Sequence, residues 1–224
     1  MQTIVEKIKE SKAIIEKAAK NFPNLVVAVS GGKDSIVVMH LARQAAPNAK
    51  VFAVLTRFKP LETRIYLSEM SKLMGCDITV YENKDAIVAD DYYKSNPDEC
   101  CRILKVEPTF WALSQLKADA WITGLRRTEG RTRTNYMPLE KYIEIDGRQV
   151  FKVNPILDWT ETDIWKYFAI NQLPVHPYYA AGYRSLGCAP CTKLVDDAET
   201  ERAGRWLGTS KCGGECGIHT VHKK

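Results

Sequence analysis

Short apolar runs alternate along the chain with longer segments whose apolar residues recur at helical spacing. Four runs have the length and β-branched content of buried strands: 25–29, 51–55, 78–81 and 120–123. Amphipathic or apolar helices are predicted at 3–22, from 36 to about 46, at 61–74, from 107 to about 116 and from 160 to about 170. Such alternation predicts an α/β fold, a mostly parallel sheet with helices on both faces.

Turn and capping residues mark several element ends. Gly75 is a stop signal for the helix before it, and Asp146-Gly147 predicts a hairpin, or a turn into another strand, between 142 and 153. Thr160, with an acidic residue three positions later, predicts a capped helix start. Cys100-Cys101 is expected at the start of a helix. From about residue 196 we expect a short helix and a glycine-bearing tail, so the chain divides into a body, 1–195, and a C-terminal segment, 196–224.

A candidate anion site lies between the first predicted strand and its helix. It reads Ser30-Gly31-Gly32-Lys33-Asp34-Ser35. Backbone N–H groups at a helix start, with the helix dipole, attract an anion, and the two glycines allow a phosphate to approach closely. Lys33 can add a formal charge. The loop therefore predicts a phosphate site at the carboxyl end of a buried strand, where parallel sheets bind ligands.

Composition limits the function classes further. The chain has 224 residues, 45% of them hydrophobic and 26% charged, as in soluble globular proteins. No apolar stretch is long enough to span a bilayer, and charges interrupt the first twenty residues, which excludes a signal peptide. We expect a cytoplasmic protein with no membrane contact. The net charge of +5 suits a small anionic ligand or a weak nucleic-acid contact and does not choose between them. A nucleic-acid partner is not expected.

Seven cysteines in such a protein indicate metal binding or catalysis. Cys188-x-x-Cys191 is compatible with zinc, iron–sulfur and redox sites. The adjacent pair Cys100-Cys101 favours a 4Fe–4S cluster over zinc, because neighbouring thiolates reach different corners of a cluster more easily than one tetrahedral ion. Zinc and buried, unligated thiols remain the alternatives. Cys76, at a strand entrance, is predicted to be a core residue.

The tail carries a candidate nucleophile. Cys216 lies in a glycine-flanked tail, with Arg205 and Lys211 upstream. Nearby positive charge lowers the pKa of a thiol, and a flexible tail lets the thiolate reach a substrate. A bystander thiol or an extra metal ligand are the alternatives. Cys212, separated from Cys216 by Gly213, Gly214 and one further residue, is a candidate resolving thiol; a bystander role is equally compatible with the spacing.

With these motifs the chain resembles the adenylyl-sulfate and phosphoadenylyl-sulfate reductases of assimilatory sulfate reduction. The resemblance covers nearly the whole chain. It rests on the phosphate loop and on six further segments: Cys100-Cys101, Ile122 to Arg127, Pro155 to Trp159, Gly187 to Cys191, Gly204 to Trp206 and Glu215 to His219.

The resemblance implies an adenine-nucleotide hydrolase-like fold and a 4Fe–4S cluster. Its implied ligands are Cys100, Cys101, Cys188 and Cys191. Cys216 would attack the sulfonate sulfur of adenylyl sulfate or its 3′-phosphorylated form, expelling the nucleotide; thioredoxin or a similar dithiol would then release sulfite. Members with the cluster generally use adenylyl sulfate, which is therefore favoured. Homo-oligomers are allowed.

The predicted substrate-binding residues combine the loop with nearby cations and polar groups. They are Ser30, Gly31, Gly32, Lys33, Asp34, Ser35, Gly124, Arg126, Arg127, Arg205, Lys211 and His219. Two alternative functions remain. The intact loop and the basic segment after 124 suit an ATP-using adenylating enzyme, such as one that thiolates a nucleic acid or resembles sulfate adenylyltransferase. A non-catalytic iron–sulfur module that binds nucleotides is the other.

Overall fold

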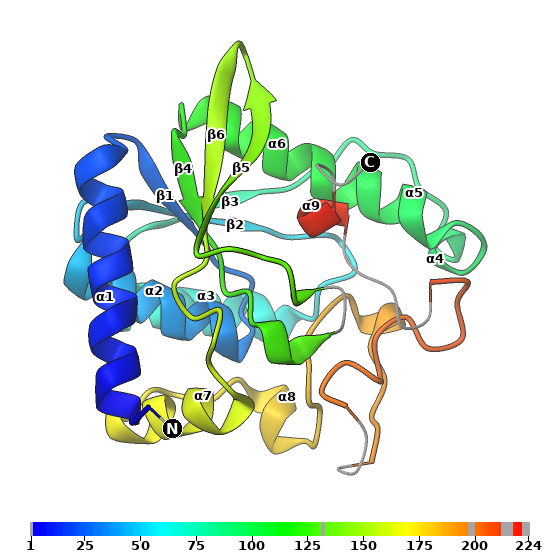
Figure 1. Cartoon of the computed structure of the whole chain (residues 1–224). Coiled ribbons are helices and arrows are strands. Elements are labelled where there is room, and N and C mark those ends of the chain that lie inside the picture. Colours follow the sequence, from blue (N-terminus) through cyan, green and yellow to red (C-terminus); the bar gives the residue numbers. More distant parts are fainter. Residues whose placement is uncertain (1, 131–132, 197–199, 212–216, 221–224) are drawn as a thin grey trace.

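A six-stranded sheet forms the centre of the protein (Figure 1). The computed structural model describes residues 2–130, 133–196, 200–211 and 217–220. The strands are β1 (Leu25–Ala28), β2 (Lys50–Val54), β3 (Ile78–Tyr81), β4 (Ala120–Ile122), β5 (Leu139–Ile145) and β6 (Arg148–Val153). Their order in the sheet is β3-β2-β1-β4-β6-β5.

All neighbouring strands are parallel except β5 and β6, which form the predicted hairpin. Asp146 and Gly147 turn it with φ angles of 51° and 71°, a conformation that Asp and Gly tolerate. From β1 the chain moves outward through β2 to β3 and then returns to β4 on the other side of β1. The sheet therefore has a topological switch point at the carboxyl ends of β1 and β4, where this class of fold binds ligands.

Helices follow most strands at the predicted places. The longer ones are α1 (Ile4–Asn21), α2 (Lys33–Ala45), α3 (Leu61–Leu73), α6 (Glu107–Gln115) and α7 (Glu161–Ile170). The shorter ones are α4 (Tyr92–Ser95), α5 (Pro97–Cys101), α8 (Pro177–Ala180) and α9 (Gly217–Thr220), with the π-helix η1 (Arg102–Val106) and the 3₁₀ turns η2 (Arg127–Glu129) and η4 (Ala189–Cys191). The capping box at the start of α7 is confirmed: Thr160 and Asp163 bond each other's backbone N–H groups.

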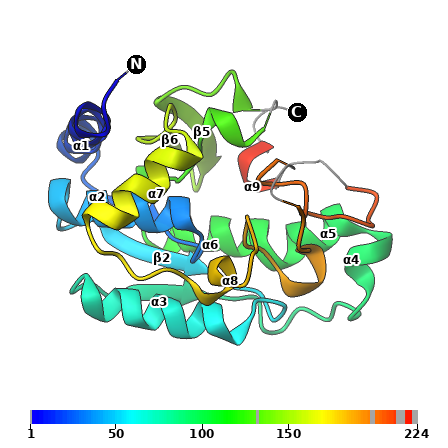
Figure 2. The same ribbon diagram turned by 90° about the horizontal axis from the view of Figure 1, so that it is seen from below.

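Two apolar layers cover the sheet. Val27 of β1 packs into a core with α1, α2, α3 and α7, whereas its neighbour Val26 packs with α6 and the C-terminal segment on the other face. This alternation is the two-residue period of a strand buried on both sides. Both views show α7 beside α2, and α9 near α5 and α6 (Figure 1, Figure 2). The predicted α/β class with helices on both faces is confirmed. Cys76 is half-buried and packs against the first core.

Two local predictions were wrong. Cys100 and Cys101 end α5 instead of starting a helix, and the chain continues from them through the π-turns of η1 into α6. Residues 200–211 form turns and one β-bridge, between Thr192 and Arg205, where a short helix was expected. The N–H of Lys193 donates to the carbonyl of Gly204 at 2.9 Å, and a Cβ on Gly204 would collide with the carbonyl oxygen of Lys193, so backbone pairing with this stretch takes the place of the helix. Within the described part of the chain, every helix is too short or too polar to cross a lipid bilayer.

Candidate active site

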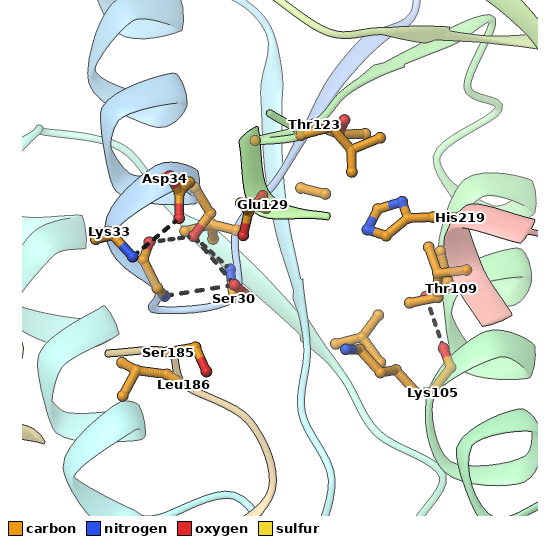
Figure 3. A pocket seen from close by; sticks show the side chains of 18 of the residues that line it. Ser30, Lys33, Asp34, Lys105, Thr109, Thr123, Glu129, Ser185, Leu186 and His219 are labelled. Carbon is orange, nitrogen blue, oxygen red and sulfur yellow. Dashed lines mark hydrogen bonds and ion pairs between the residues drawn. The ribbon is translucent and has the colours of Figure 1, made fainter. Parts of the chain in front are cut away.

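A pocket opens at the switch point between β1 and β4 (Figure 3). It has a cavity volume of about 170 Å³, and the phosphate loop forms one of its walls. Figure 3 shows Ser30 on that wall, with His219 and Lys105 pointing into the cavity from the opposite side. Trp121 and Thr123 of the β4 region also line the pocket. The fold therefore brings the loop after β1 and the C-terminal end of the described chain to one cavity.

Glycines allow two close backbone approaches at this loop. Gly31 has a φ of +83°, and a Cβ there would lie 2.8 Å from a methyl carbon of Thr63. A Cβ on Gly124 would lie 2.9 Å from both the carbonyl carbon of Asp34 and the backbone nitrogen of Ser35. Because Gly31 has no side chain, the phosphate loop packs directly against α3. For the same reason, the loop after β4 packs at Gly124 against the start of α2.

Several groups of the loop already bond within the protein. The hydroxyl of Ser35 donates to the carbonyl of Gly32 at 2.8 Å and accepts from the N–H of Ser30 at 3.1 Å. The N–H of Lys33 donates to the Tyr179 hydroxyl at 3.0 Å, and burial raises the pKa of that hydroxyl. The loop is therefore held in shape before any ligand binds, and part of its donor capacity is used by the protein.

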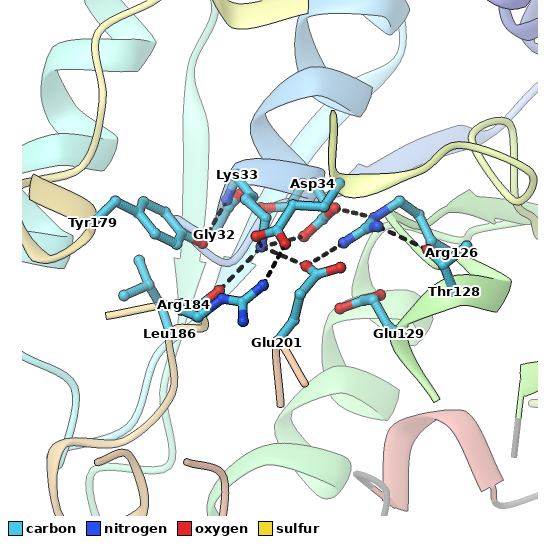
Figure 4. A network of polar contacts seen from close by, with 12 residues as sticks. Gly32, Lys33, Asp34, Arg126, Thr128, Glu129, Tyr179, Arg184, Leu186 and Glu201 are labelled. Atoms are coloured by element: carbon cyan, nitrogen blue, oxygen red, sulfur yellow. Dashed lines mark hydrogen bonds and ion pairs between the residues drawn. The ribbon is translucent and has the colours of Figure 1, made fainter. Parts of the chain in front are cut away.

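Lys33 is placed differently from a phosphate-binding cation. Its side chain is 2% exposed, and its ammonium lies 2.9 Å from a carboxylate oxygen of Glu201 and 3.1 Å from the carbonyl oxygen of Arg184 (Figure 4). Burial opposes the charged form, but the nearby charges of Asp34, Tyr179 and Glu201 outweigh it, and the pKa of Lys33 is raised. Lys33 thus lines the pocket as a buried, ion-paired cation.

The predicted arginines separate into two environments. Arg126 is fully buried, where it donates to Asp34, Glu201 and the Thr128 hydroxyl. Burial disfavours the charged form of Arg126, but the neighbouring carboxylates outweigh this effect and raise its pKa. Arg127 instead bonds Asp158 and the carbonyl of Tyr136, and it does not line the pocket. The structure therefore brings Arg126 to the loop network and leaves Arg127 outside it.

Beyond the cavity a second pocket contains four thiols. Cys100, Cys101, Cys188 and Cys191 all line it, together with apolar side chains such as Leu104 and Trp206. Burial, then the neighbouring thiols, raise the pKa of Cys100 to about 11 and of Cys191 to about 12. Such thiols ionise only when a cationic centre binds among them, so the donor set and its apolar surroundings fit the cluster that the sequence predicts. In the described ranges, no group of three or more His, Cys, Asp or Glu residues could hold a single metal ion.

Three cations line both pockets. They are Lys59, Lys105 and Arg205. Arg205 is 8% exposed; its guanidinium donates to the carbonyl of Leu186 at 2.8 Å and lies 4.5 Å from the centre of the Trp206 ring. Its Nε atom is buried and has no hydrogen-bond partner among the described residues. These cations form a positive partition between the pocket at the phosphate loop and the four thiols.

Residues 217–220, the last described part of the chain, contribute two side chains to the pocket. The Ile218 side chain and the His219 ring line it, and the His219 ring stacks on Trp121 with centroids 6.4 Å apart. Lys211 is buried near the thiol pocket instead, where it pairs with Asp98 and lies 5.3 Å from the Trp206 ring centre. The candidate nucleophile Cys216 and the candidate resolving thiol Cys212 lie outside the described residues.

Sequence reasoning missed several residues of the site. They are Lys59, Lys105, Thr109, Trp121, Thr123, Glu129, Tyr179, Glu201 and Arg202. One sequence feature could have indicated Lys105: it lies one helical turn after Cys101 and therefore projects near the cysteine pair. No sequence feature indicates Glu201, because a glutamate in a charged stretch is typical of a solvated surface.

Comparisons with known proteins agree with this geometry. Residues 24–194 match the phosphoadenosine phosphosulfate reductase domain family. An adenosine 5′-phosphosulfate reductase of Halalkalibacterium halodurans is 34% identical over 221 residues, covering 94% of this chain and 92% of the relative. One from Bacillus cereus is 33% identical over 224 residues, covering 96% and 92%.

Solved structures show the fold. A phosphoadenylyl-sulfate reductase from Candida auris in a phosphate complex has a TM-score of 0.70 at 21% identity, covering 86% of this chain and 96% of that one. An NH3-dependent NAD synthetase from Campylobacter jejuni has a TM-score of 0.55 at 17% identity, covering 82% and 79%. At these identities the likeness establishes a shared adenine-nucleotide hydrolase-like architecture.

Proposed function

The chain belongs to the phosphoadenosine phosphosulfate reductase family, and from this premise we propose that it reduces adenylyl sulfate to sulfite and AMP. It is an oxidoreductase acting on a sulfur group. The observation that carries the proposal is the partition of Lys59, Lys105 and Arg205, which lines the nucleotide pocket on one side and the four-thiol pocket on the other. A nucleotide anion in the first pocket would lie against cations that also border the thiols.

Two observations favour adenylyl sulfate over its 3′-phosphorylated form. The relatives at 33–34% identity carry the name adenosine 5′-phosphosulfate reductase. The four-cysteine set is present in full, which in the resembled family accompanies adenylyl sulfate. The 3′-phosphorylated substrate is the alternative within the same reaction.

We assign the nucleophile to Cys216. Its thiolate would attack the sulfonate sulfur, forming a sulfur–sulfur bond while the bond between sulfur and the bridging phosphate oxygen breaks. AMP would leave with that electron pair. A dithiol such as thioredoxin would then attack the cysteine sulfur, sulfite would leave with two electrons, and the dithiol would become a disulfide. Cys212 is a candidate for an internal version of this second step.

The pocket residues have separate roles in this chemistry. Negative charge grows on the departing phosphate and on the sulfonate oxygens, and Lys105, Arg202 and Arg205 are the lining cations placed to stabilise it. His219 can donate a hydrogen bond from its ring. The shaped loop Ser30–Ser35 offers hydroxyls and its remaining backbone donors to the phosphate.

The four cysteines would hold a 4Fe–4S cluster. Such a group would supply local charge and order beside the substrate anion, and the two electrons for sulfite would come from the dithiol. Lys105, one turn after Cys101, and Arg205 lie between the two pockets, so they can orient the anion with respect to the thiol site. The five described cysteines are free, which supports a reducing, cytoplasmic setting.

The C-terminal segment acts as a separate functional unit in this proposal. Residues 1–195 supply the loop and the cluster ligands, and 196–224 supply Arg202, Arg205, Cys216 and His219. A dithiol partner must reach the cysteine after the nucleotide leaves, so the segment has to expose it at that stage. Homo-oligomers are compatible with this arrangement.

The decisive experiment measures sulfite. Protein purified without oxygen is incubated with adenylyl sulfate or its 3′-phosphorylated form and a dithiol, and sulfite and AMP are quantified. Adenylyl sulfate should give equal amounts of both, and Cys216→Ser should give neither. Cys76→Ser is the matched control, because Cys76 lies in the α/β core, and it should retain activity. ATP-dependent pyrophosphate exchange without sulfite release would instead establish the adenylating alternative.

A further inference from the structure

A carboxylate of the C-terminal segment pairs with Lys33 of the phosphate loop and with Arg126 of the loop after β4. One oxygen of Glu201 lies 2.9 Å from the ammonium of Lys33 and 2.5 Å from a guanidinium nitrogen of Arg126 (Figure 4). The side chains of Lys33, Arg126 and Glu201 are 2%, 0% and 10% exposed. This is the arrangement of an anion held by two buried cations, with the anion supplied by the protein itself.

The surrounding network is balanced in charge. Three cationic side chains and three carboxylates share it: Lys33, Arg126 and Arg184 with Asp34, Glu161 and Glu201. Among the described residues, this network has no net charge left for a ligand phosphate at Lys33. Removing one carboxylate would leave an uncompensated buried cation, which is strongly unfavourable until another anion arrives.

The same carboxylate fixes the course of the chain that follows it. Glu201 directly precedes Arg202 and lies four residues before Arg205, and both arginines line the nucleotide pocket. The backbone pairing of Thr192 with Arg205 fixes the other end of this stretch. Glu201 is therefore the ionic contact that ties residues 200–205 to the loop after β1.

We propose that Glu201 positions Arg202 and Arg205 by anchoring them on Lys33 and Arg126, and that it thereby makes the site reject nucleoside triphosphates. Its carboxylate occupies the place at which the loop lysine would meet further phosphate groups. This inference rests on the proposed function and adds a specificity determinant to it. A substrate with one phosphate and one sulfonate meets the segment's arginines, whereas a triphosphate would also have to displace a buried carboxylate.

The test measures dissociation constants by calorimetry for adenylyl sulfate, AMP and ATP, using the full chain purified without oxygen. Glu201→Gln keeps the shape and removes the charge. Loss of a charged hydrogen-bond partner predicts that adenylyl sulfate binds about tenfold more weakly and that the ratio of the ATP to the AMP constant falls about tenfold. The ratio to AMP corrects for any general loosening of the pocket.

Two further variants make the result specific. Glu201→Asp retains the charge, so the ratio of the ATP to the AMP dissociation constant should stay near the wild-type value. Its side chain is one methylene shorter, so adenylyl sulfate should bind more weakly. Glu82→Gln is the matched control, because Glu82 is similarly buried, at 13% exposed, and pairs with Arg64 away from the pocket. It should leave all three constants unchanged.

Two results together overturn the inference: Glu201→Gln leaves the ratio of the ATP to the AMP dissociation constant unchanged, and it leaves adenylyl sulfate binding unaffected. The proposed function would still stand. Failure of the wild-type chain to bind AMP or adenylyl sulfate overturns both. Should Glu201→Gln unfold, as a thermal melt would show, Glu201→Asp decides: weaker adenylyl sulfate binding supports the positioning role, and wild-type binding refutes it.

Discussion

The phenolic hydroxyl of Tyr142 donates a 2.6 Å hydrogen bond to the backbone carbonyl oxygen of Ile218. The Tyr136 hydroxyl donates to the next carbonyl, that of His219. Below both rings lies the ammonium of Lys152, 4.4 Å and 5.2 Å from the ring centres of Tyr136 and Tyr142. Tyr142 of β5 and Tyr136, three residues before β5, therefore hold the short helix α9 at the pocket, immediately after the proposed nucleophile in the sequence.

Tyr142→Phe should lower catalysis by loosening α9. The lost hydrogen bond predicts a decrease of about 1 kcal/mol in the free energy of unfolding. Tyr66→Phe is the matched control, because the Tyr66 hydroxyl donates to the carbonyl of Pro174 at 2.8 Å, away from the pocket. Both variants should lose similar stability, but only Tyr142→Phe should lower kcat/KM for adenylyl sulfate several-fold. Equal activity of the two variants would show that α9 needs no such anchor.

Lys105→Met should weaken substrate binding. Lys105 is half-buried between the nucleotide and thiol pockets, so its charge is less screened than that of a surface lysine. Removing a charged contact predicts that KM for adenylyl sulfate rises about tenfold or more. The exposed Lys94 offers a control with the same charge change, and Lys94→Met should leave KM within experimental error. A KM that is equal in both variants, with kcat unchanged, would remove Lys105 from the substrate site.

The fold was predictable because its signals are local. The apolar run 25–29, the glycine after residue 74 and the Asp146-Gly147 turn each determine an element through its own residues. The π-turns after Cys101 were not predictable, since they depend on how η1 packs against the C-terminal segment, including the contact between Val106 and Gly217. The turn structure of residues 200–211 likewise depends on pairing with a distant strand-like stretch around Thr192.

The candidate site was predictable where a motif carries its own chemistry. The loop at Ser30 and the four cysteines gather at two adjoining pockets, as the motifs indicate. The partners of Lys33 could not be predicted, because the sequence shows a lysine in a glycine loop and gives no sign of a carboxylate 168 positions later in the chain. The same applies to Arg126 and Arg127, adjacent residues that the backbone directs into different surroundings.

The iron content of the protein should depend on the four cysteines of the second pocket. Protein purified without oxygen should contain about four iron and four sulfide per chain if a single cubane is present. Cys191→Ser should lose most of both, since Cys191 is one of the two buried thiols of the set. Cys76→Ser should retain full iron and sulfide. Zinc bound in place of iron, or equal iron in both variants, would contradict the cluster assignment.

Protonation of His176 at low pH should destabilise the phosphate loop. Its Nδ1 accepts the N–H of Tyr178 at 3.1 Å, and its Nε2 lies 3.1 Å from the hydroxyl of Thr63, the residue on which Gly31 is seated. Burial, and then the charge of Lys59, lower the pKa of His176 from 6.5 to about 4. The neutral ring is therefore the form that the folded protein requires.

Between about pH 6.5 and pH 4 the unfolded chain binds the proton and the folded chain does not. The free energy of unfolding should therefore fall as the pH decreases through this window. His176→Gln removes the titrating group, so the stability difference between wild type and variant should be largest near neutral pH and shrink toward pH 4. Thr63→Val removes the hydroxyl partner but no titrating group, and its stability loss should be the same at each pH. Denaturant unfolding at several pH values measures both, and a constant difference for His176→Gln would contradict the role of a neutral, buried imidazole.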